Sequence, residues 1–320
     1  MTAERGPGPG PGPVRVAVIG VGALGQHHAR VYADLPGAVL AGLYDIDRQR
    51  AVEVAGRHGV RVFDHLRDLL PEVDAVSVAV PTVDHHRVAR ALLEAGKDVL
   101  VEKPMTTTIA EAEDLIRLAA ERRAVFQVGH IERFNPTVDV LKATVSRPRF
   151  IEVHRLGSFS PRSLDIDVVL DLMIHDLDIV LFLDGSEAVQ VDAVGVPVLT
   201  PRVDIANVRL RFQSGLIANL TASRVSAEKV RKFRVFSPRT YISVDFARRE
   251  AQVYRLGDGP AGPEIQAEHT AAPDEEPLRR QLAAFVECAR SRSQPVVSGA
   301  DGLRALRLAH SILARIAEQG

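Results

Sequence analysis

The sequence predicts an α/β fold in which a doubly wound parallel sheet is followed by an α+β domain with an open, mostly antiparallel sheet. Three observations support this prediction. Short apolar runs alternate with helical patterns up to about residue 128, as in parallel strand–helix units. From residue 189 onward, runs of alternating apolar and polar residues indicate antiparallel strands. A length of 320 residues also suits two domains better than one.

Composition and charge narrow the class of protein. Hydrophobic residues make up 46% of the chain, which is enough to build sizeable cores. The formal net charge is -1, so nothing indicates a general affinity for nucleic acid or anionic lipid. Cys288 is the only cysteine, which excludes an internal disulfide framework and a multi-cysteine zinc site. Without a signal-peptide core or a membrane-spanning run, we expect a soluble cytoplasmic protein, and we predict no metal site.

A glycine-rich turn follows the first predicted strand. Residues 1–13 are rich in Gly and Pro and predict a disordered lead-in, and Val14–Ile19 predict a strand. The pattern G-x-G-x-x-G then precedes a helical stretch that runs to about Leu35. In this setting, glycines make a tight turn, admit a pyrophosphate to the backbone and let helix and strand pack closely. The cofactor-binding candidates in this turn are Gly20, Gly22, Ala23, Leu24 and Gly25.

The second strand, predicted over Ala38 to Tyr44, ends in an acidic residue. Asp45 lies twenty residues beyond Gly25, where a carboxylate accepts hydrogen bonds from the adenosine ribose hydroxyls. A carboxylate there repels a 2′-phosphate, so the sequence favours NAD over NADP. Arg48 keeps NADP open, because an arginine pairs with that phosphate.

The same alternation of strand and helix continues to the sixth strand, which completes a dinucleotide-binding domain at residues 14–128. The loop that begins at Pro81 follows a buried strand and lies at the edge where such sheets bind ligands. There Thr82 either caps the next helix or touches the cofactor, and His85 belongs either to the helix start or to the site. The predicted strands are 59–63, 75–80, 99–102 and 125–129, and the predicted helices are 47–58, 65–70, 85–95 and 110–122.

The central strand of this domain delivers a lysine to the ligand edge. Val99-Leu100-Val101 is apolar throughout, as in a strand covered on both faces, and Glu102-Lys103-Pro104 follows at once. A residue before proline is pushed towards extended geometry, so Lys103 should stand at the carboxyl end of the strand. We therefore predict Lys103 as a catalytic and cofactor-binding group, with Glu102 beside it.

The second domain is predicted over residues 129–320. Its predicted helix at 167–183 is apolar on nearly every side, yet Asp167, Asp171, His175 and Asp178 recur at helical spacing. Burying such groups is costly unless they pair or line a wet cavity, so we place Asp171 and His175 in the active-site cleft. The other predictions are a polar loop at 129–136, a helix at 137–145, strands at 150–159, 189–196, 204–212, 216–223, 232–236, 241–246 and 251–256, a loop at 257–273, and helices at 277–291 and 299–318 that pack back towards the first domain.

Taken together, these motifs resemble the glucose–fructose oxidoreductase / inositol dehydrogenase (Gfo/Idh/MocA) family. The resemblance rests on the glycine turn, on Pro81-Thr82-x-x-His85, on Gly96 to Pro104 and on Asp171-x-x-x-His175. It implies a Rossmann domain, NAD(P) dependence, and homodimers or homotetramers made through the open sheet. Residues 129–136 and 171–178 are most similar to the branch that acts on nucleotide-linked amino sugars such as UDP-N-acetylglucosamine, at C3.

The family resemblance also implies catalytic roles. Lys103 and His175 are the expected catalytic pair, with Asp171 beside them, and the reaction is hydride transfer between nicotinamide and a secondary alcohol. His175 is expected to take the hydroxyl proton while Lys103 stabilises the developing alkoxide. Lys103 is the alternative base, and the sequence does not separate the two assignments. Arg133, Arg155 and Arg162 are candidates for the substrate pyrophosphate, because guanidinium groups bind phosphate oxygens in a fork.

Other functions remain open at this point. An inositol or free-sugar dehydrogenase of the same family is one alternative, and an NAD-sensing protein without catalysis is another. A third is an oxidoreductase of the same fold that acts on a tetrapyrrole, an imine or a diol. A nucleic-acid role has only the basic residues between Lys229 and Arg234 in its favour.

Overall fold

The computed structural model describes residues 12–160, 166–259, 262–271 and 273–318. Contacts within the chain divide it into two units. The first extends to Ile131 and includes Glu276–Leu303, whereas the second comprises Glu132–Glu275 and the residues from Arg304 onward. Helix α8 (Pro277–Ser291) therefore belongs to the first unit, and helix α9 (Gly299–Ala317) begins in the first and ends in the second. The predicted disordered lead-in lies, up to residue 11, outside the described residues.

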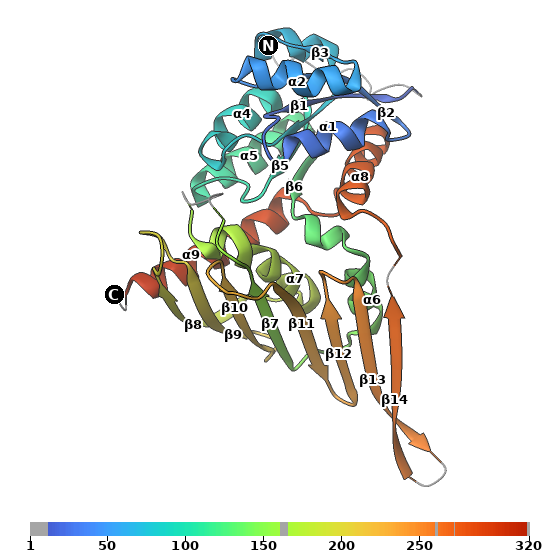
Figure 1. The fold of residues 1–320 in the computed structure, drawn as a ribbon, viewed down its shortest axis with the longest axis vertical. Coiled ribbons are helices and arrows are strands. Elements are labelled where there is room, and N and C mark those ends of the chain that lie inside the picture. Colours follow the sequence, from blue (N-terminus) through green and yellow to red (C-terminus); the bar gives the residue numbers. More distant parts are fainter. Residues whose placement is uncertain (1–11, 161–165, 260–261, 272, 319–320) are drawn as a thin grey trace. The chain divides into compact units, whose positions relative to one another are not determined.

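The first unit is built on a parallel sheet of six strands (Figure 1). The strand order is β3-β2-β1-β4-β5-β6, which is the order of a Rossmann sheet and confirms the predicted fold class. Strands β2 and β3 are added on one side of β1, and β4 to β6 are added on the other side, so the order switches between β1 and β4. Ligands bind at this switch point in such folds. The strands are β1 (Val14–Ile19), β2 (Ala38–Tyr44), β3 (Arg61–Val62), β4 (Ala75–Val78), β5 (Asp98–Glu102) and β6 (Phe126–Gly129).

Helices connect these strands and cover the sheet. Helices α1 and α2 pack with α8 over β1 and β2, whereas α4 and α5 pack with each other and α4 lies against β4 and β5. Helix α8 repeats apolar residues at helical spacing, so Leu278, Leu282 and Phe285 enter the core beside Tyr32 of α1. The helices are α1 (Gly25–Ala33), α2 (Arg48–His58), α3 (Leu66–Leu69), η1 (Leu70–Glu72), α4 (Thr82–Glu94), α5 (Ile109–Arg122) and α8 (Pro277–Ser291).

The second unit contains an eight-stranded sheet in the order β14-β13-β12-β11-β7-β10-β9-β8. Only β7 and β10 pair in parallel, and the other neighbours are antiparallel, as predicted. The strands are β7 (Phe150–Leu156), β8 (Ala188–Val196), β9 (Ile205–Phe212), β10 (Ile217–Ser223), β11 (Val230–Ser237), β12 (Thr240–Asp245), β13 (Glu250–Gly259) and β14 (Gly262–Ala271).

The prediction of a loop over residues 257–273 is wrong. Strand β13 extends to Gly259, and Gly262–Ala271 form β14, which pairs antiparallel with β13 along its whole length. Almost every residue of β14 is exposed, so neither face needs an apolar side chain. The usual alternation is therefore missing from the sequence, and the glycines and prolines of this stretch favour a loop.

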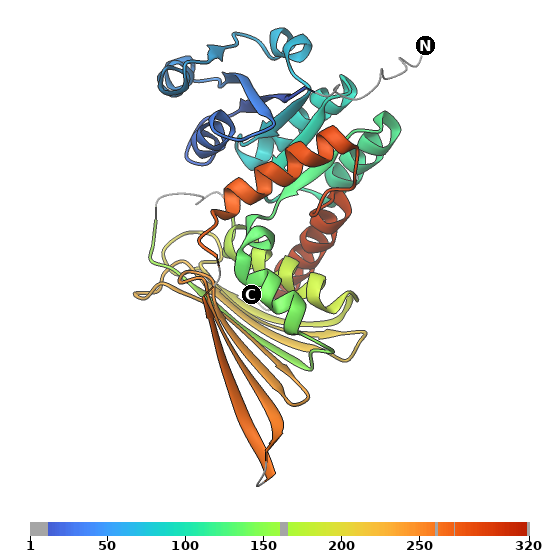
Figure 2. The same ribbon diagram turned by 90° about the vertical axis from the view of Figure 1, so that its right-hand side faces the viewer.

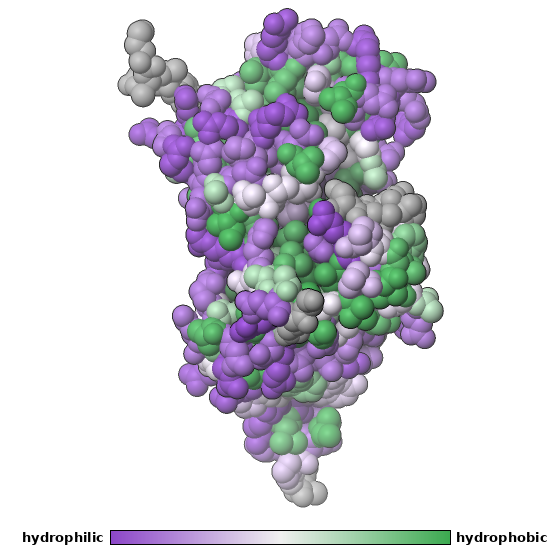
Figure 3. Space-filling view, turned by 90° about the vertical axis from the view of Figure 1, so that its left-hand side faces the viewer, coloured by the Kyte–Doolittle hydropathy of each residue, from purple (hydrophilic) through white to green (hydrophobic). Residues whose placement is uncertain are grey.

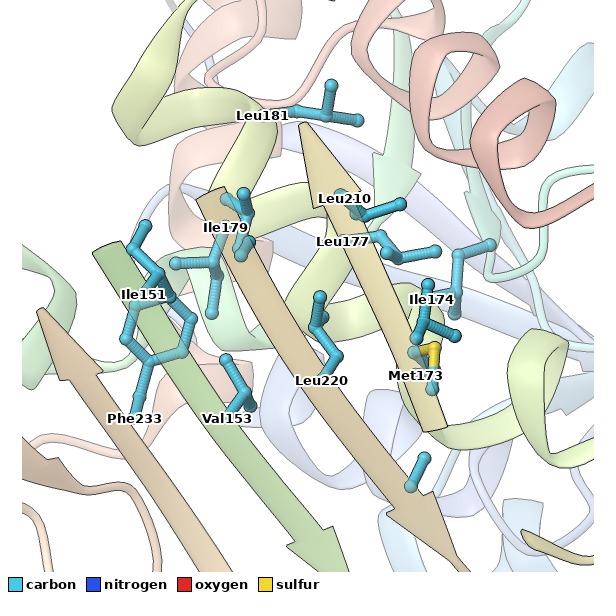
Figure 4. Close-up of a cluster of buried hydrophobic side chains, with 14 of the residues drawn as sticks. Ile151, Val153, Met173, Ile174, Leu177, Ile179, Leu181, Leu210, Leu220 and Phe233 are labelled. Atoms are coloured by element: carbon cyan, nitrogen blue, oxygen red, sulfur yellow. The ribbon is translucent and has the colours of Figure 1, made fainter. Parts of the chain in front are cut away.

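The helices of the second unit cover one face of this sheet and leave the other face bare (Figure 2). Leu177 and Ile179 of α7 pack on Ile151, Leu220 and other residues of the strands, as Figure 4 shows. Helix α7 is buried on nearly every side, which confirms the prediction from its apolar sequence. The helices are η2 (Ile131–Phe134), α6 (Pro136–Thr144), the π-helix η3 (Val169–Met173), α7 (Ile174–Asp184) and α9 (Gly299–Ala317).

A row of aromatic side chains crosses four strands of this sheet. Phe150, Phe236, Tyr241 and Tyr254 are direct neighbours across β7, β11, β12 and β13. Their ring centroids are 5.5, 4.8 and 5.5 Å apart along the row. The residues that alternate with them, such as Ile151, enter the core, so the row lies on the face opposite the helices.

The surface is mainly polar, with apolar patches on the face drawn in Figure 3. Exposed apolar side chains include Val194 and Val196 of β8, and Val198 and Leu199 of the loop that follows it. No helix among the described residues is long and apolar enough to cross a membrane.

Candidate functional site

The glycine turn between β1 and α1 has the geometry that its sequence predicts. Gly20 has a φ of +81°, and a Cβ atom there would lie 2.8 Å from the backbone of Ala79 and Val80. A Cβ on Gly25 would lie 1.7 Å from the carbonyl oxygen of Gly20, so the third glycine allows helix and strand to approach. Gly22 is open, with Arg50 Nη1 as its nearest neighbour at 3.9 Å. The middle glycine therefore leaves room at the backbone.

The residues of this turn fit a dinucleotide pyrophosphate. Helix α1 begins after Leu24 without a side-chain cap and without an acidic residue in its first turn. Its first backbone N–H groups and its dipole therefore favour a negative charge at this end. Ala23 and Leu24 are exposed at the turn.

Asp45 stands at the carboxyl end of β2, and its carboxylate orders the turns around it. Oδ2 accepts a hydrogen bond from the N–H of Val21 at 2.8 Å, and Oδ1 accepts one from Asp47 at 2.9 Å. The side chain of Asp45 thus fixes the glycine turn directly. The sequence had indicated only a contact with the cofactor ribose.

Arg50 lies beside Asp45 and also pairs with Asp47, whereas Arg48 pairs with Asp64. Arg50 Nη1 lies 3.8 Å from Asp45 Oδ2, whereas Arg48 pairs with Asp64. Helix α2 begins after Asp47, so Arg50 stands in its first turn and faces back to the glycine turn. A contact of Arg48 with a 2′-phosphate stays a prediction, and Arg50 is a second candidate for it.

The loop after β4 and the start of α4 contain the predicted Pro81, Thr82 and His85. Pro81 is the N-cap of α4 and Thr82 is the first helical residue, so Thr82 does not cap this helix. His85 is buried, with Nδ1 2.9 Å from the carbonyl oxygen of Pro104 and Nε2 2.9 Å from that of Val80. His85 therefore belongs to the helix start and also contacts the segment that carries Lys103.

Glu102 and Lys103 lie at the carboxyl end of β5, as predicted. The Glu102 carboxylate is buried against His28 of α1, with Oε1 3.2 Å from His28 Nε2. The backbone N–H of Lys103 donates to Glu102 Oε2 at 3.3 Å, and the Lys103–Pro104 peptide bond is cis. Burial alone raises the pKa of Glu102, but the hydrogen bond and charge of His28 and the charge and backbone N–H of Lys103 together lower it.

The second unit carries Asp171 and His175 on consecutive elements. Asp171 lies in the π-helix η3 and His175 in the first turn of α7, and both are partly exposed. The wider π turn is marked by the Ile174 N–H, which bonds to the carbonyl of Val169 five residues earlier. The predicted continuous α-helix is therefore wrong at this point. Such π turns recur at functional sites, because they turn side chains away from the regular helical register.

The other two acids of the predicted stripe have partners of their own. Asp167 Oδ1 accepts the N–H of Val203 at 2.9 Å, ahead of the helix. Asp178 is buried, and its carboxylate accepts two hydrogen bonds from the Arg133 guanidinium, of 2.7 and 2.9 Å. Neither of these two carboxylates therefore lies on a solvent-exposed face of the helix.

Arg133 and Arg155 are both buried and paired with carboxylates. Arg133 bridges to Asp178 and stacks on Phe182, with its guanidinium carbon 4.0 Å from the ring centre. Arg155 bonds to Asp176 through two contacts of 2.7 and 2.8 Å and to Glu132 at 3.0 Å. This pairing favours a structural role for both arginines. Their contact with a substrate phosphate stays a prediction. Arg162 lies outside the described residues.

The buried Arg155 cluster fixes the start of α7, where His175 stands. Burial alone lowers the pKa of Arg155. The charges of Asp176 and Glu132 and their hydrogen bonds raise this pKa by more than burial lowers it, so the guanidinium stays charged. Asp176 follows His175 directly in α7, and Arg155 lies in β7. A helix residue adjacent to His175 is thus anchored to the sheet by a two-point bond.

Comparison with known proteins agrees with this geometry. Residues 14–130 match the family model described as the oxidoreductase family with an NAD-binding Rossmann fold, and residues 137–242 match the GFO/IDH/MocA C-terminal domain. A UDP-N-acetylglucosamine 3-dehydrogenase from Acidithiobacillus ferrooxidans is 41% identical over 91% of this chain and 94% of its own length. The chain belongs to the GFO/IDH/MocA oxidoreductase family. Its first unit is accordingly the NAD-binding Rossmann domain of this family.

Other family members are similar over most of the chain. A myo-inositol 2-dehydrogenase from Thermotoga maritima is 28% identical over 92% of this chain and 93% of its own length. A solved structure of the A. ferrooxidans UDP-N-acetylglucosamine 3-dehydrogenase has a TM-score of 0.90 and 40% identity, covering 95% of this chain and 97% of that one. A levoglucosan dehydrogenase solved with NADH and levoglucosan has a TM-score of 0.87 at 20% identity and supports the fold alone.

Sequence reasoning missed three participants of the candidate site. His28 lies in α1 and pairs with Glu102, Arg50 lies beside Asp45, and Asp176 anchors the start of α7. His28 follows the third glycine by three residues, which is the one signal the sequence offered. The described residues contain no group of three or more His, Cys, Asp and Glu side chains that could hold a metal ion.

Proposed function

We propose that this chain is an NAD-dependent dehydrogenase of a secondary hydroxyl on a nucleotide-linked amino sugar, with C3 of UDP-N-acetylglucosamine as the preferred position. The observation that carries this proposal is the 41% identity, over nearly the whole of both chains, to an enzyme named for that reaction. The residues of the proposed chemistry are all present in this chain: Lys103, Asp171 and His175.

The proposed reaction divides the work between the cofactor and the chain. Bound NAD supplies the acceptor for the hydride that leaves the alcohol carbon. His175 takes the hydroxyl proton, because an imidazole titrates near working pH, and Asp171 orients the ring and stabilises its charged form. Lys103 donates to the substrate oxygen and stabilises the charge that develops there. Lys103 is the alternative base in this scheme.

Asp45 and Arg50 set the proposed cofactor preference. The Asp45 carboxylate is suited to accept the ribose hydroxyls and repels a 2′-phosphate, so NAD is the preferred cofactor. Arg50, at 3.8 Å from Asp45, is the cation next to that position. NADP use, where it occurs, then depends on Arg50, because Arg50 lies beside Asp45 while it also pairs with Asp47 at 3.1 Å.

A substrate panel tests the proposal. UDP-N-acetylglucosamine, UDP-glucose, N-acetylglucosamine, glucose and myo-inositol are each offered with NAD or NADP, and reduced cofactor is followed by absorbance. We expect the highest kcat/KM for UDP-N-acetylglucosamine with NAD. Equal activity on the free sugar would contradict the nucleotide requirement, and turnover of none of them would favour an NAD-sensing protein.

An inositol or free-sugar dehydrogenase is the second candidate, favoured by the full-length similarity to a myo-inositol 2-dehydrogenase. Its identity of 28% is well below the 41% of the nucleotide-sugar enzyme, which is why we place it second. In the panel above, a preference for myo-inositol over every UDP-sugar would reverse this order.

We also propose that two copies associate through the bare face of the eight-stranded sheet. The aromatic row from Phe150 to Tyr254 on this face offers apolar surface that the helices of the unit do not cover. Aromatic residues are enriched at the centre of protein interfaces. A dimer, or a tetramer built from dimers, is the assembly that we expect.

A further inference from the structure

Two buried histidines contact the residues on either side of Lys103. His28 of α1 reaches Glu102, which precedes the lysine, and His85 of α4 reaches Pro104, which follows it. We propose that His28 and His85 are positioning residues that hold Lys103 from both sides. This inference rests on the proposed function, in which Lys103 stabilises the reacting oxygen.

The first contact fixes the Glu102 side chain. His28 is 1% exposed, and its Nε2 lies 3.2 Å from Glu102 Oε1. Among the described residues, His28 Nδ1 has no hydrogen-bond partner, so Nε2 is the ring nitrogen that donates to the Glu102 carboxylate. A side-chain amide also offers an N–H donor to this carboxylate, and this allows a conservative replacement.

The carboxylate has little freedom to leave this position. A Cβ atom on Gly129 would lie 2.6 Å from Glu102 Oε1, so β6 has a glycine where the carboxylate rests on its backbone. The other oxygen accepts the backbone N–H of Lys103 at 3.3 Å. His28 and the Lys103 backbone thus bind the two oxygens of one buried carboxylate, and the position of the carboxylate defines that of the peptide that follows.

The second contact connects the loops after β4 and β5. Both ring nitrogens of His85 lie 2.9 Å from backbone carbonyl oxygens, one from Pro104 and one from Val80. A neutral ring donates to one of these oxygens, and an imidazolium donates to both. In either state the ring lies between the two loops and sets the distance from Pro104 to the start of α4.

Holding the backbone of Lys103 matters because its amine must meet a particular oxygen. A displacement of about 1 Å at a catalytic group can cost about a hundredfold in rate. The two rings act through residues 102 and 104, so their effect should fall on kcat and leave cofactor binding nearly unchanged. Their ring nitrogens contact residues 80, 102 and 104, and none of these residues belongs to the glycine turn proposed for the pyrophosphate.

The sequence offers matched controls, because each buried histidine has an exposed or half-exposed histidine beside it. His27 is exposed on α1, and the partly buried His86 of α4 pairs with Asp114 of α5. We expect His28→Leu and His85→Leu to lower kcat by about 10- to 100-fold with KM for NAD within about twofold. His27→Leu and His86→Leu should stay within about twofold, and His28→Gln, which keeps a donor for Glu102, should recover most of the loss.

A double-mutant cycle separates positioning from a general structural effect. If His28 acts through Lys103, then His28→Leu costs less than about twofold more in a Lys103→Ala background. Losses that multiply would show that His28 acts elsewhere and would overturn the proposal. Thermal unfolding of each full-length variant confirms that it folds.

Hydrogen exchange of the peptide 101–106 gives a readout that does not depend on catalysis. We expect His28→Leu to speed exchange at the Lys103 amide by about tenfold or more, and His27→Leu to leave it unchanged. If exchange in His28→Leu were unchanged, the positioning role of His28 would be refuted and the proposed function would stand. Near-normal turnover in Lys103→Ala would instead refute the proposed function, and with it the catalytic meaning of the two contacts.

Discussion

At the scale of single residues, Lys103 and His175 carry the proposed chemistry. Replacing either by Ala should lower kcat by about a hundredfold or more, because each handles a proton or a developing charge in the transition state. KM for NAD should change little in His175→Ala, since the glycine turn and Asp45 are intact, whereas Lys103→Ala also removes a predicted cofactor contact. Steady-state kinetics on UDP-N-acetylglucosamine and fluorescence titration with NADH measure the two effects.

A histidine away from the proposed site provides the control for this prediction. His154 lies in β7 on the face opposite the helices, so His154→Ala should keep near-normal turnover. If His175→Ala also turned over normally, His175 would not be the base. The same outcome for Lys103→Ala would remove the lysine from the mechanism.

Cofactor preference is a second question for single residues. Asp45→Asn keeps an oxygen for the Val21 N–H but removes the charge that repels a 2′-phosphate. We expect kcat/KM to fall about tenfold with NAD and to rise about tenfold with NADP, from charge effects of about 1.4 kcal/mol each. Assays with both cofactors give the ratio.

Two arginines distinguish the source of NADP binding in that variant. Arg50 lies beside Asp45, whereas Arg48 pairs with Asp64, so Arg50→Ala in the Asp45→Asn background should remove the gain with NADP. Arg48→Ala in the same background should leave it. An effect of Arg48→Ala that matched that of Arg50→Ala would contradict this assignment.

At the scale of secondary-structure elements, the sequence predicted most strands and helices because each carries a local pattern. Strand β5 is apolar and ends at an X-Pro pair, and α8 repeats apolar residues at helical spacing. The exceptions have physical reasons. Strand β14 is exposed on both faces and needs no apolar alternation, and the π turn of η3 inserts a wider turn that leaves no mark in the composition.

The candidate site was less predictable than the elements that carry it. Glycine positions, Asp45, Glu102 and Lys103 follow from short-range spacing after strands, so their placement could be predicted. Pairs such as Arg155–Asp176 join segments far apart in the chain. A single sequence contains no record of such partners, and an arginine that neutralises a buried acid looks the same as one that binds phosphate.

The loop between β8 and β9 depends on one buried carboxylate. Asp204 accepts the backbone N–H groups of Val198, Leu199 and Thr200, at 2.8, 2.6 and 2.8 Å. It also binds Arg224 Nε at 2.8 Å. Burial raises the pKa of Asp204, but the hydrogen bonds from Thr200, Arg224 and the backbone outweigh burial and hold the pKa well below its usual range.

We therefore expect a pH-dependent contribution to stability from Asp204. A carboxyl whose pKa is lowered by folding stabilises the fold above its unfolded pKa of about 3.9, and this contribution is lost as pH falls through the folded value. Asp204→Asn should lower the free energy of unfolding by about 2–3 kcal/mol at pH 7. The difference from the wild type should shrink below about pH 4.

Denaturant unfolding at pH 7 and at pH 3 measures that difference. Asp192→Asn is a suitable control, because Asp192 is an exposed acid on β8 of the same sheet. A difference between Asp204→Asn and wild type that stayed constant from pH 7 to pH 3 would show that the charge of Asp204 is not what stabilises the loop.

At the scale of the whole molecule, the chain returns to its first unit after completing most of the second. Helix α8 comes from residues 277–291 and yet packs in the core of the Rossmann unit beside Tyr32. A chain that stopped before Glu276 would leave apolar surface of α1 and β1 uncovered. The first unit is therefore complete only with this later segment of the sequence.

Association of whole molecules is the remaining prediction, and it follows from the aromatic row on the bare face of the eight-stranded sheet. Phe236 is 36% exposed, and a lysine in place of Phe236 or Tyr241 would bring charge to the centre of the proposed interface. We expect light scattering to give a dimer or tetramer for the wild type at micromolar concentration and a monomer for Phe236→Lys/Tyr241→Lys. Ile46→Lys, at a position 88% exposed in the first unit, should leave the mass unchanged. A monomeric wild type would refute the association, and a double variant with the wild-type mass would move the interface away from the aromatic row.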